Sequence, residues 1–133
     1  MERWLGNYSA IAYAVMRFVA GLLFACHGAQ KLFGALGGQQ VSGHPLMTVA
    51  GIIEFVGGLL VCIGLWAGCA AFVCSGQMAV AYFMAHAPNG FWPILNHGEL
   101  AALYCFVFLF IATRGSGRYS VEALLLAWFA RRR

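Results

Sequence analysis

Charge is what this sequence lacks most. Of its 133 residues, 9% are charged and 62% are hydrophobic, whereas an average soluble protein is about 25% charged. From Phe55 to Leu95 no Asp, Glu, Lys or Arg occurs. A bilayer crossing takes about 20 apolar residues. The composition therefore argues against a soluble fold. It predicts a single all-α domain, a polytopic membrane four-helix bundle with a short C-terminal interfacial helix.

Motifs of several other protein classes are also missing. The five cysteines form no Cys-x-x-Cys pair and no zinc-ligand spacing, and no His-x-x-x-His occurs on one helix, so we find no metal or haem motif. No basic face alternates with exposed aromatics, so no nucleic-acid partner is expected. We also expect no cleavable signal peptide, because the first hydrophobic segment carries His27 and Lys31 and lacks a small-x-small site.

Apolar segments and their Gly and Pro breakers set the expected helix bounds. Gly21, Gly28 and Gly34 would let the first helix pack closely on one side. Asn96 is the expected N-cap of the fourth helix, and Ser120 that of the last. The expected membrane helices are residues 10–36, 46–66, 69–87 and 96–113, and the interfacial helix is 120–130.

The net charge of +4 comes from the two ends of the chain. Basic residues stay on the cytoplasmic side of a bacterial inner membrane. We therefore expect an even number of spans, with both termini cytoplasmic, in the bacterial inner (plasma) membrane. Membrane lipids are the expected surroundings, and anionic headgroups suit the terminal arginines. These arginines are Arg3, Arg114, Arg118 and Arg131 to Arg133.

The first membrane helix carries Arg17, His27 and Lys31. A charge in the middle of such a helix costs roughly 2.5–3.5 kcal/mol on insertion scales, so this face should turn towards protein partners. His27 and Lys31 lie one turn apart on the same face. Arg17 lies about 20 Å deeper than Lys31 at 1.5 Å per residue and belongs to a separate inner site. Binding to backbone carbonyls or to interfacial phosphate is an alternative role for Arg17.

Antiparallel threading should bring ionisable groups of four helices together in the outer half of the bundle. Glu54 is a lone carboxylate between Gly51 and Gly58 on one helix face, and it must contact another helix. Simpler roles stay open for the group: snorkelling for the lysine, a helix-end position for the histidines and Glu99, and a structural salt bridge for Glu54. The six groups are His27, Lys31, Glu54, His86, His97 and Glu99.

Three chemistries suit carboxylates, histidines and a lysine beneath an aromatic loop. The site could hold a quinone headgroup, donate to its carbonyls and exchange protons with it. It could bind a metal or haem through histidine, despite the missing motif. It could also gate a polar solute, although four short helices leave little room for a pore.

Four blocks of this chain resemble the DoxX family of small bacterial membrane proteins, over about residues 16–125. The resemblance rests on their order and spacing: Arg17 followed by GLLFACHGAQKLFG, then GIIEFVGGLLVCIGL, AYFMAHAPNGFWP and NHGELAALYCFVFLFIATRGSGRYSVEALL. It implies a polytopic inner-membrane protein. Members are described as small subunits of a terminal quinol oxidase or of thiosulfate:quinone oxidoreductase, and others are associated with oxidative-stress complexes. The family pattern implies functional roles for Arg17, His27, Lys31, Glu54, His86, Asn96 and Glu99.

These observations favour a quinone-associated subunit of a membrane oxidoreductase. Glu54 and Glu99 would handle protons as the catalytic pair. No cofactor-attachment motif occurs, so a partner protein would supply electrons, and a partner or homo-oligomer is expected. The alternatives are a non-catalytic assembly or scaffold subunit and, third, a small-solute permease. The expected quinone-binding residues are Arg17, His27, Lys31, His86 and Asn96.

Overall fold

The computed structural model describes residues 2–132, and every regular element in that range is helical. The predicted all-α class is therefore confirmed. Three elements are short π-helical or 3₁₀ turns that continue longer helices. In chain order the elements are α1 (Glu2–Gly6), α2 (Ser9–Phe33), α3 (Pro45–Ile52), the π turn η1 (Ile53–Gly57), α4 (Gly58–Ile63), α5 (Ala67–Ala81), the π turn η2 (Tyr82–His86), the 3₁₀ turn η3 (Ala87–Asn89), α6 (Pro93–Asn96), α7 (Glu99–Arg114) and α8 (Val121–Ala130).

Within residues 2–132, three continuous helical stretches are long and apolar enough to cross a membrane. They are α2 with 25 residues, Pro45–Ile63 with 19 and Ala67–Asn89 with 23. The fourth expected span, residues 96–113, corresponds to α7, which has 16 residues. It is thus shorter than predicted and shorter than the roughly 20 residues of a typical crossing. The chain is thus a multi-pass helical membrane protein.

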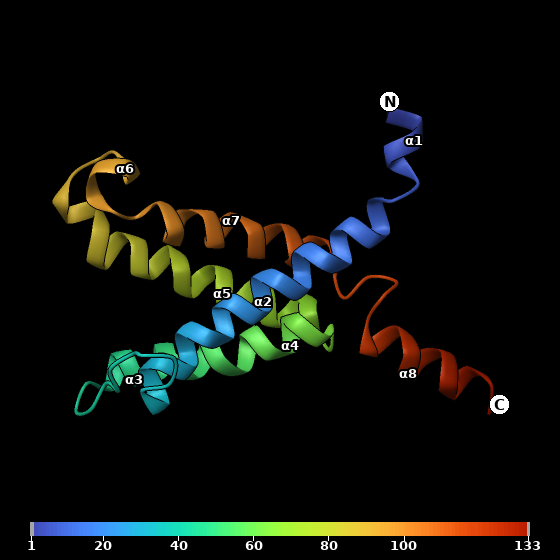
Figure 1. The fold of residues 1–133 in the computed structure, drawn as a ribbon, viewed down its shortest axis with the longest axis horizontal. Coiled ribbons are helices and arrows are strands. Elements are labelled where there is room, and N and C mark those ends of the chain that lie inside the picture. Colours follow the sequence, from blue (N-terminus) through green and yellow to red (C-terminus); the bar gives the residue numbers. More distant parts are fainter. Residues whose placement is uncertain (1, 133) are drawn as a thin grey trace.

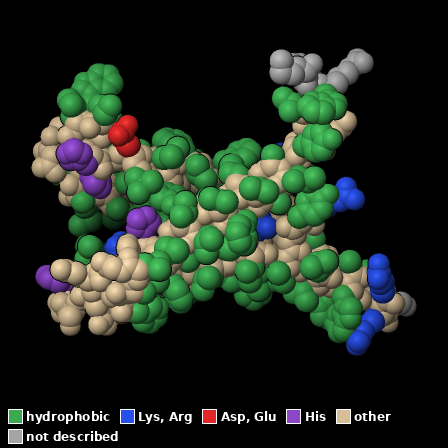
Figure 2. All heavy atoms as spheres, in the orientation of Figure 1, with side chains coloured by type: hydrophobic (Ala, Val, Ile, Leu, Met, Phe, Trp, Pro, Cys, Tyr) green, Lys and Arg blue, Asp and Glu red, His purple; other side chains and the backbone are tan. Residues whose placement is uncertain are grey.

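The helices form two antiparallel pairs that cross (Figure 1). In the first pair, α2 packs along α3, η1 and α4, and in the second, α5 packs along α7. Contacts of α5 with α4 and η1 join the pairs near their middle. The pairs spread apart at the end that carries α3 and α6, while α1 and α8 project from the opposite end. Hydrophobic side chains cover much of the face shown in Figure 2, and most of the lysines and arginines visible there lie at the α1 and α8 end.

Glycine lets the two backbones of the first pair touch. A Cβ atom added to Gly21 would lie 2.5 Å from the Cys62 amide nitrogen, and one added to Gly58 would lie 2.6 Å from that of Ala25. Gly28 is as crowded against the backbone of Phe55. The predicted close packing is therefore confirmed at Gly21 and Gly28.

Two helices end earlier than predicted because a glycine turns left-handed. Gly34 has φ +64° and ends α2 at Phe33 rather than at residue 36, so it is a helix stop and not a packing position. Gly64 has φ +72°. The amides of Gly64 and Leu65 donate to the carbonyls of Val61 and Leu60, which is the Schellman arrangement. The second span therefore ends at residue 63, and the third begins at residue 67.

Asn96 does not cap the fourth helix as expected. It ends the short helix α6, and His97 then turns left-handed at φ 59°. Gly98 is the N-cap of α7, and its amide donates to Asn96 Oδ1 at 2.8 Å. The break at residue 97 is why the fourth helix starts three residues later than predicted.

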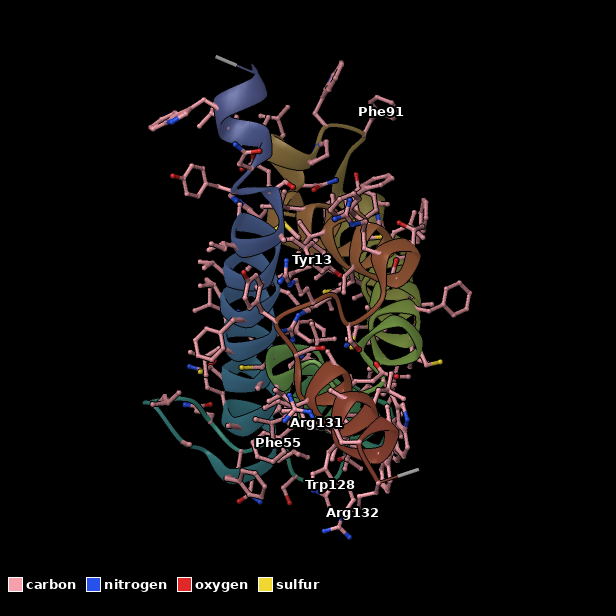
Figure 3. The ribbon with its side chains drawn as sticks, turned by 90° about the vertical axis from the view of Figure 1, so that its right-hand side faces the viewer. Tyr13, Phe55, Phe91, Trp128, Arg131 and Arg132 are labelled. Atoms are coloured by element: carbon pink, nitrogen blue, oxygen red, sulfur yellow. The ribbon has the colours of Figure 1, made fainter. Side chains whose placement is uncertain are left out.

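The C-terminal helix α8 projects from the bundle and buries none of its residues. Ser120 caps it as predicted, since the Ser120 Oγ accepts from the Ala123 amide. Figure 3 shows Trp128, Arg131 and Arg132 near the outer end of α8, where the Arg132 guanidinium lies 3.7 Å from the centre of the Trp128 ring. Arg133, the last of the three terminal arginines, lies outside the described residues.

Candidate functional site

A cavity of about 850 Å³ lies between the two helix pairs at their spread end. Its walls are mostly apolar side chains from α3 and η1 on one side and from α5 and η2 on the other. Many of these side chains are exposed on the outer surface of the helices as well, so the cavity opens sideways between them. The exposed large apolar members are Leu46, Met47, Val49, Phe72, Val73, Val80, Met84 and Leu100.

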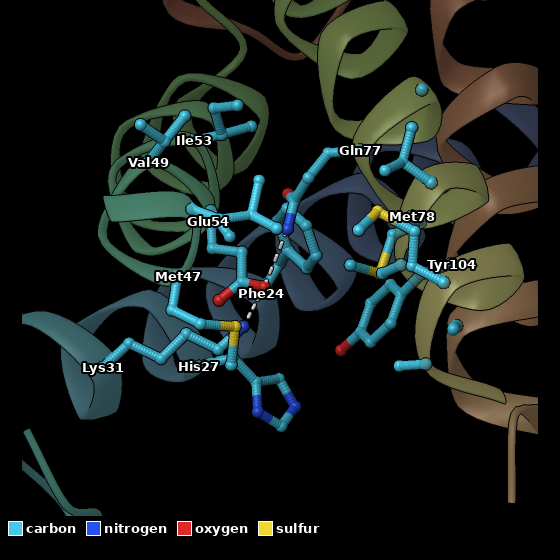
Figure 4. Close-up of a pocket in the computed structure, with 18 of the residues that line it drawn as sticks. Phe24, His27, Lys31, Met47, Val49, Ile53, Glu54, Gln77, Met78 and Tyr104 are labelled. Carbon is cyan, nitrogen blue, oxygen red and sulfur yellow. Dashed lines mark hydrogen bonds and ion pairs between the residues drawn. The ribbon is translucent and has the colours of Figure 1, made fainter. Parts of the chain in front are cut away.

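Glu54 is the buried acid of this cavity, with 2% of its surface exposed. Its Oε1 forms an ion pair with the Lys31 ammonium and accepts a hydrogen bond from Gln77 Nε2 at 2.9 Å. Figure 4 shows Lys31 and Gln77 meeting at this one carboxylate from α2 and α5. Because the carboxylate oxygen needs a donor, the Gln77 amide nitrogen must face it.

Two buried acceptor atoms lie at this point. Glu54 Oε2 and Gln77 Oε1 are buried, and neither hydrogen-bonds to any of the described residues. Buried polar atoms are nearly always paired, so each unpaired atom calls for an explanation. A ligand that brings a hydrogen-bond donor would satisfy either one.

Aromatic and histidine side chains complete the polar end. His27 packs edge-on against Tyr104, with ring centroids 6.4 Å apart. His86 lines the same cavity from η2, and His97 lines it from the turn between α6 and α7. Glu54 and His86 each lie in a π turn, and π turns inside longer helices often occur at functional sites.

Five of the six predicted ionisable groups therefore line one cavity, namely His27, Lys31, Glu54, His86 and His97. Glu99 does not line it. As predicted, it lies in the first turn of its helix, and its side chain is exposed. The described residues contain no group of three or more His, Cys, Asp or Glu side chains that could hold a metal ion.

The DoxX family model matches residues 12–87, more than half of the chain. This chain belongs to the DoxX family. It is also 38% identical over 125 residues to an uncharacterized protein of Haemophilus influenzae, and the match covers 89% of this chain and 93% of that protein. No solved structure matches. The family membership supports a helical membrane protein and leaves the chemistry of the cavity to its own residues.

In this DoxX-family chain Asn96 organises the loop beside the cavity and does not line it. Asn96 Nδ2 donates to the Gly90 carbonyl at 2.8 Å, and its backbone oxygen lies 3.1 Å from His86 Nδ1. The residue is 4% exposed. Its contacts hold His86 and the segment between η3 and α7 in place.

Arg17 lies at the other end of the molecule, as the depth estimate predicted. Its guanidinium donates to the carbonyls of Val61, Cys62 and Tyr119, the last two at 2.9 Å. It joins the end of α4 to the segment before α8 and does not line the cavity. Binding to backbone carbonyls, the alternative role for Arg17, is therefore present in the structure.

Gln77 and Tyr104 are residues of the cavity that the sequence reasoning missed. Gln77 is the single amide side chain in the predicted span 69–87, and polar side chains within membrane helices commonly bond to neighbouring helices. That signal was sufficient to select Gln77. Tyr104 carries no comparable signal, because aromatic residues are frequent throughout the fourth helix.

Proposed function

We propose that this DoxX-family protein binds a quinone in the cavity and works as a quinone-associated subunit of a bacterial membrane oxidoreductase. The observation that carries the proposal is the buried pair Glu54 and Gln77 at the polar end of an apolar cavity, each with an acceptor oxygen that no described residue hydrogen-bonds. Its volume of about 850 Å³ falls in the usual range of about 300–1,000 Å³ for small-molecule sites. Apolar walls suit a lipid-soluble tail, and the polar end suits a ring that bears oxygens.

The chemistry of Glu54 fits both redox forms of such a ligand. When ionised, Glu54 Oε2 accepts a hydrogen bond from a hydroxyl of the reduced ring. When protonated, it donates to a carbonyl of the oxidised ring. Adding or removing one proton at Glu54 therefore switches its Oε2 between hydrogen-bond donor and acceptor, while Lys31 stays paired with Oε1. We assign electron transfer to a partner protein, in keeping with the missing cofactor-attachment motif.

We further propose four membrane crossings, with α7 as the fourth and both termini cytoplasmic. The positive-inside rule supports this topology, since Arg114, Arg118, Arg131 and Arg132 all lie in or after the end of α7. In this arrangement α8 rests at the cytoplasmic interface with its apolar side chains in the bilayer.

The direct test is quinone retention by the purified protein. Wild type and the variants Glu54→Gln, Gln77→Leu and Glu99→Gln are reconstituted with a ubiquinone or menaquinone, washed, extracted and quantified by chromatography. We expect reduced retention for Glu54→Gln and Gln77→Leu. Glu99→Gln also replaces a carboxylate, but outside the cavity, and should retain the wild-type amount. Equal retention by wild type and the double variant Glu54→Gln/His27→Ala would refute the site.

A non-catalytic assembly role is the second candidate, and one observation favours it. The Lys31–Glu54 pair joins α2 to η1 within a single helix pair, which is where a buried charge pair can fix packing. In that case Glu54→Gln would weaken folding or the co-purification of a partner protein and leave quinone retention unchanged.

A further inference from the structure

We propose that the opposite end of the bundle holds a second site, which binds an anionic phospholipid. The site is a groove of about 490 Å³ between α2 and the segment that leads into α8. It lies on the Arg17 side of the molecule and shares no lining residue with the cavity described above. The proposal is thus independent of quinone binding.

The groove has the walls that an acyl chain needs. Ile11, Ala14, Val15 and Phe18 form one wall along a single face of α2, and Tyr119 stands opposite. Ile11, Val15 and Phe18 are 47–56% exposed, and they belong to a membrane-length helix. Side chains at this spacing form a continuous apolar stripe, along which a lipid tail can lie.

The charged residue that lines this groove is a buried cation, Arg17. Arg17 is 3% exposed. Its hydrogen bonds go to carbonyls, its Nε has no partner among the described residues, and no carboxylate that the structure describes forms an ion pair with it. The carbonyls of Val61 and Cys62 are at the negative end of the α4 dipole and offset part of the charge. A buried cation is still costly unless an anion balances it.

Further arginines make this end of the molecule positive. The Arg118 guanidinium lies 5.9 Å from the centre of the Tyr119 ring, next to the groove, and Arg114 lies over Tyr13. Glu122, the carboxylate nearest to Tyr119 in the sequence, accepts a hydrogen bond from the Ser116 hydroxyl. The positive charge favours an anionic over a zwitterionic headgroup. The apolar wall favours a lipid phosphate over free phosphate.

The test compares lipid binding by variants that fill the groove with variants that do not. Ala14→Leu adds bulk inside the groove and leaves every arginine in place. Ala12→Leu makes the same change at an exposed position of α2 outside the groove and is the matched control. Arg118→Gln removes one charge. Purified protein is titrated with phosphatidylglycerol, phosphatidylcholine or inorganic phosphate, and bound lipid is counted by native mass spectrometry.

We expect phosphatidylglycerol to bind wild type more tightly than phosphatidylcholine. Arg118→Gln should weaken that binding by about fivefold, the usual effect of one arginine near an anionic headgroup. Ala14→Leu should weaken it as well, because it fills the groove, while Ala12→Leu should not. Equal binding of the two lipids would overturn the proposal. So would competition by millimolar phosphate alone, or identical results for the two alanine variants. Quinone retention by Ala14→Leu should be unchanged, and a joint loss of quinone and lipid would indicate general disruption instead of a groove.

Discussion

Removing Lys31 should destabilise the protein far more than neutralising Glu54, although the two residues form one ion pair. The reason is their unequal burial, since 27% of the Lys31 side chain is exposed and 2% of the Glu54 side chain. Lys31→Met leaves a buried carboxylate with Gln77 as its remaining partner. Glu54→Gln leaves a lysine whose ammonium can reach the surface.

The expected magnitudes follow from these two outcomes. Breaking a buried pair so that one charge is left behind costs about 3–5 kcal/mol, which is the expectation for Lys31→Met. Glu54→Gln keeps an oxygen that can accept from both Lys31 and Gln77, so its cost should be about 1 kcal/mol, the scale of one hydrogen bond. The two variants should therefore differ by about 2–4 kcal/mol, or roughly 30-fold to several hundredfold in the unfolding equilibrium.

Reversible unfolding by SDS, followed by circular dichroism in mixed micelles, measures both values. The double variant Lys31→Met/Glu54→Gln completes the cycle and should be more stable than Lys31→Met alone, because it no longer buries an uncompensated charge. If Glu54→Gln proved as destabilising as Lys31→Met, the burial asymmetry would not control the energetics and the reasoning would be wrong.

Three further results are expected. Gly28→Ala should destabilise the protein by about 1–3 kcal/mol through overpacking, while Gly76→Ala, where an added Cβ meets nothing within 4 Å, should be neutral or stabilising in the same SDS titration. Glu99→Gln should leave quinone retention and unfolding unchanged, because the exposed carboxylate does not line the cavity. Tyr13→Phe removes the hydroxyl that donates to the Gly115 carbonyl and should cost about 0.5–1.5 kcal/mol, again read from the unfolding midpoint.

The fold class and the approximate spans could be predicted because they depend on composition and length. Helix ends were harder to predict, since one residue type can have different roles. Gly21 and Gly34 occur in one apolar stretch, yet Gly21 lies against the backbone of Cys62 and Gly34 ends the helix in a left-handed turn. Which role applies depends on the neighbouring helix, and one sequence does not contain that information.

For the site, the sequence predicts the depth of a residue but not the orientation of its side chain. Sequence position places a residue at a depth in the bilayer, and it brought His27, Lys31 and Glu54 correctly to one level. It does not fix where a side chain points around the helix axis or how loops fold back. Glu99 has a suitable depth but is exposed, and Asn96 turns into its own loop. Both departures from the expected arrangement arise at the break around residue 97, which apolar patterning does not reveal.

The crossing of the two helix pairs explains why the cavity exists and suggests how it can be opened or closed. Lys31 and Glu54 belong to the first pair, whereas Gln77 and Tyr104 belong to the second, so the site is divided between two units that meet near their middle. Gly57 is at that meeting point, where an added Cβ would lie 2.5 Å from Cys74 Sγ.

Because Cys74 is fully buried, its thiol has little room to move, and Gly57→Ala should force the pairs apart. The bond between Gln77 and Glu54 would lengthen while the Lys31 ion pair survived within its own unit. We therefore expect Gly57→Ala to lower quinone retention, and the double variant Gly57→Ala/Cys74→Ala, which removes the sulfur, to restore it. Wild-type retention by the single variant would show that the spacing of the pairs does not control the cavity.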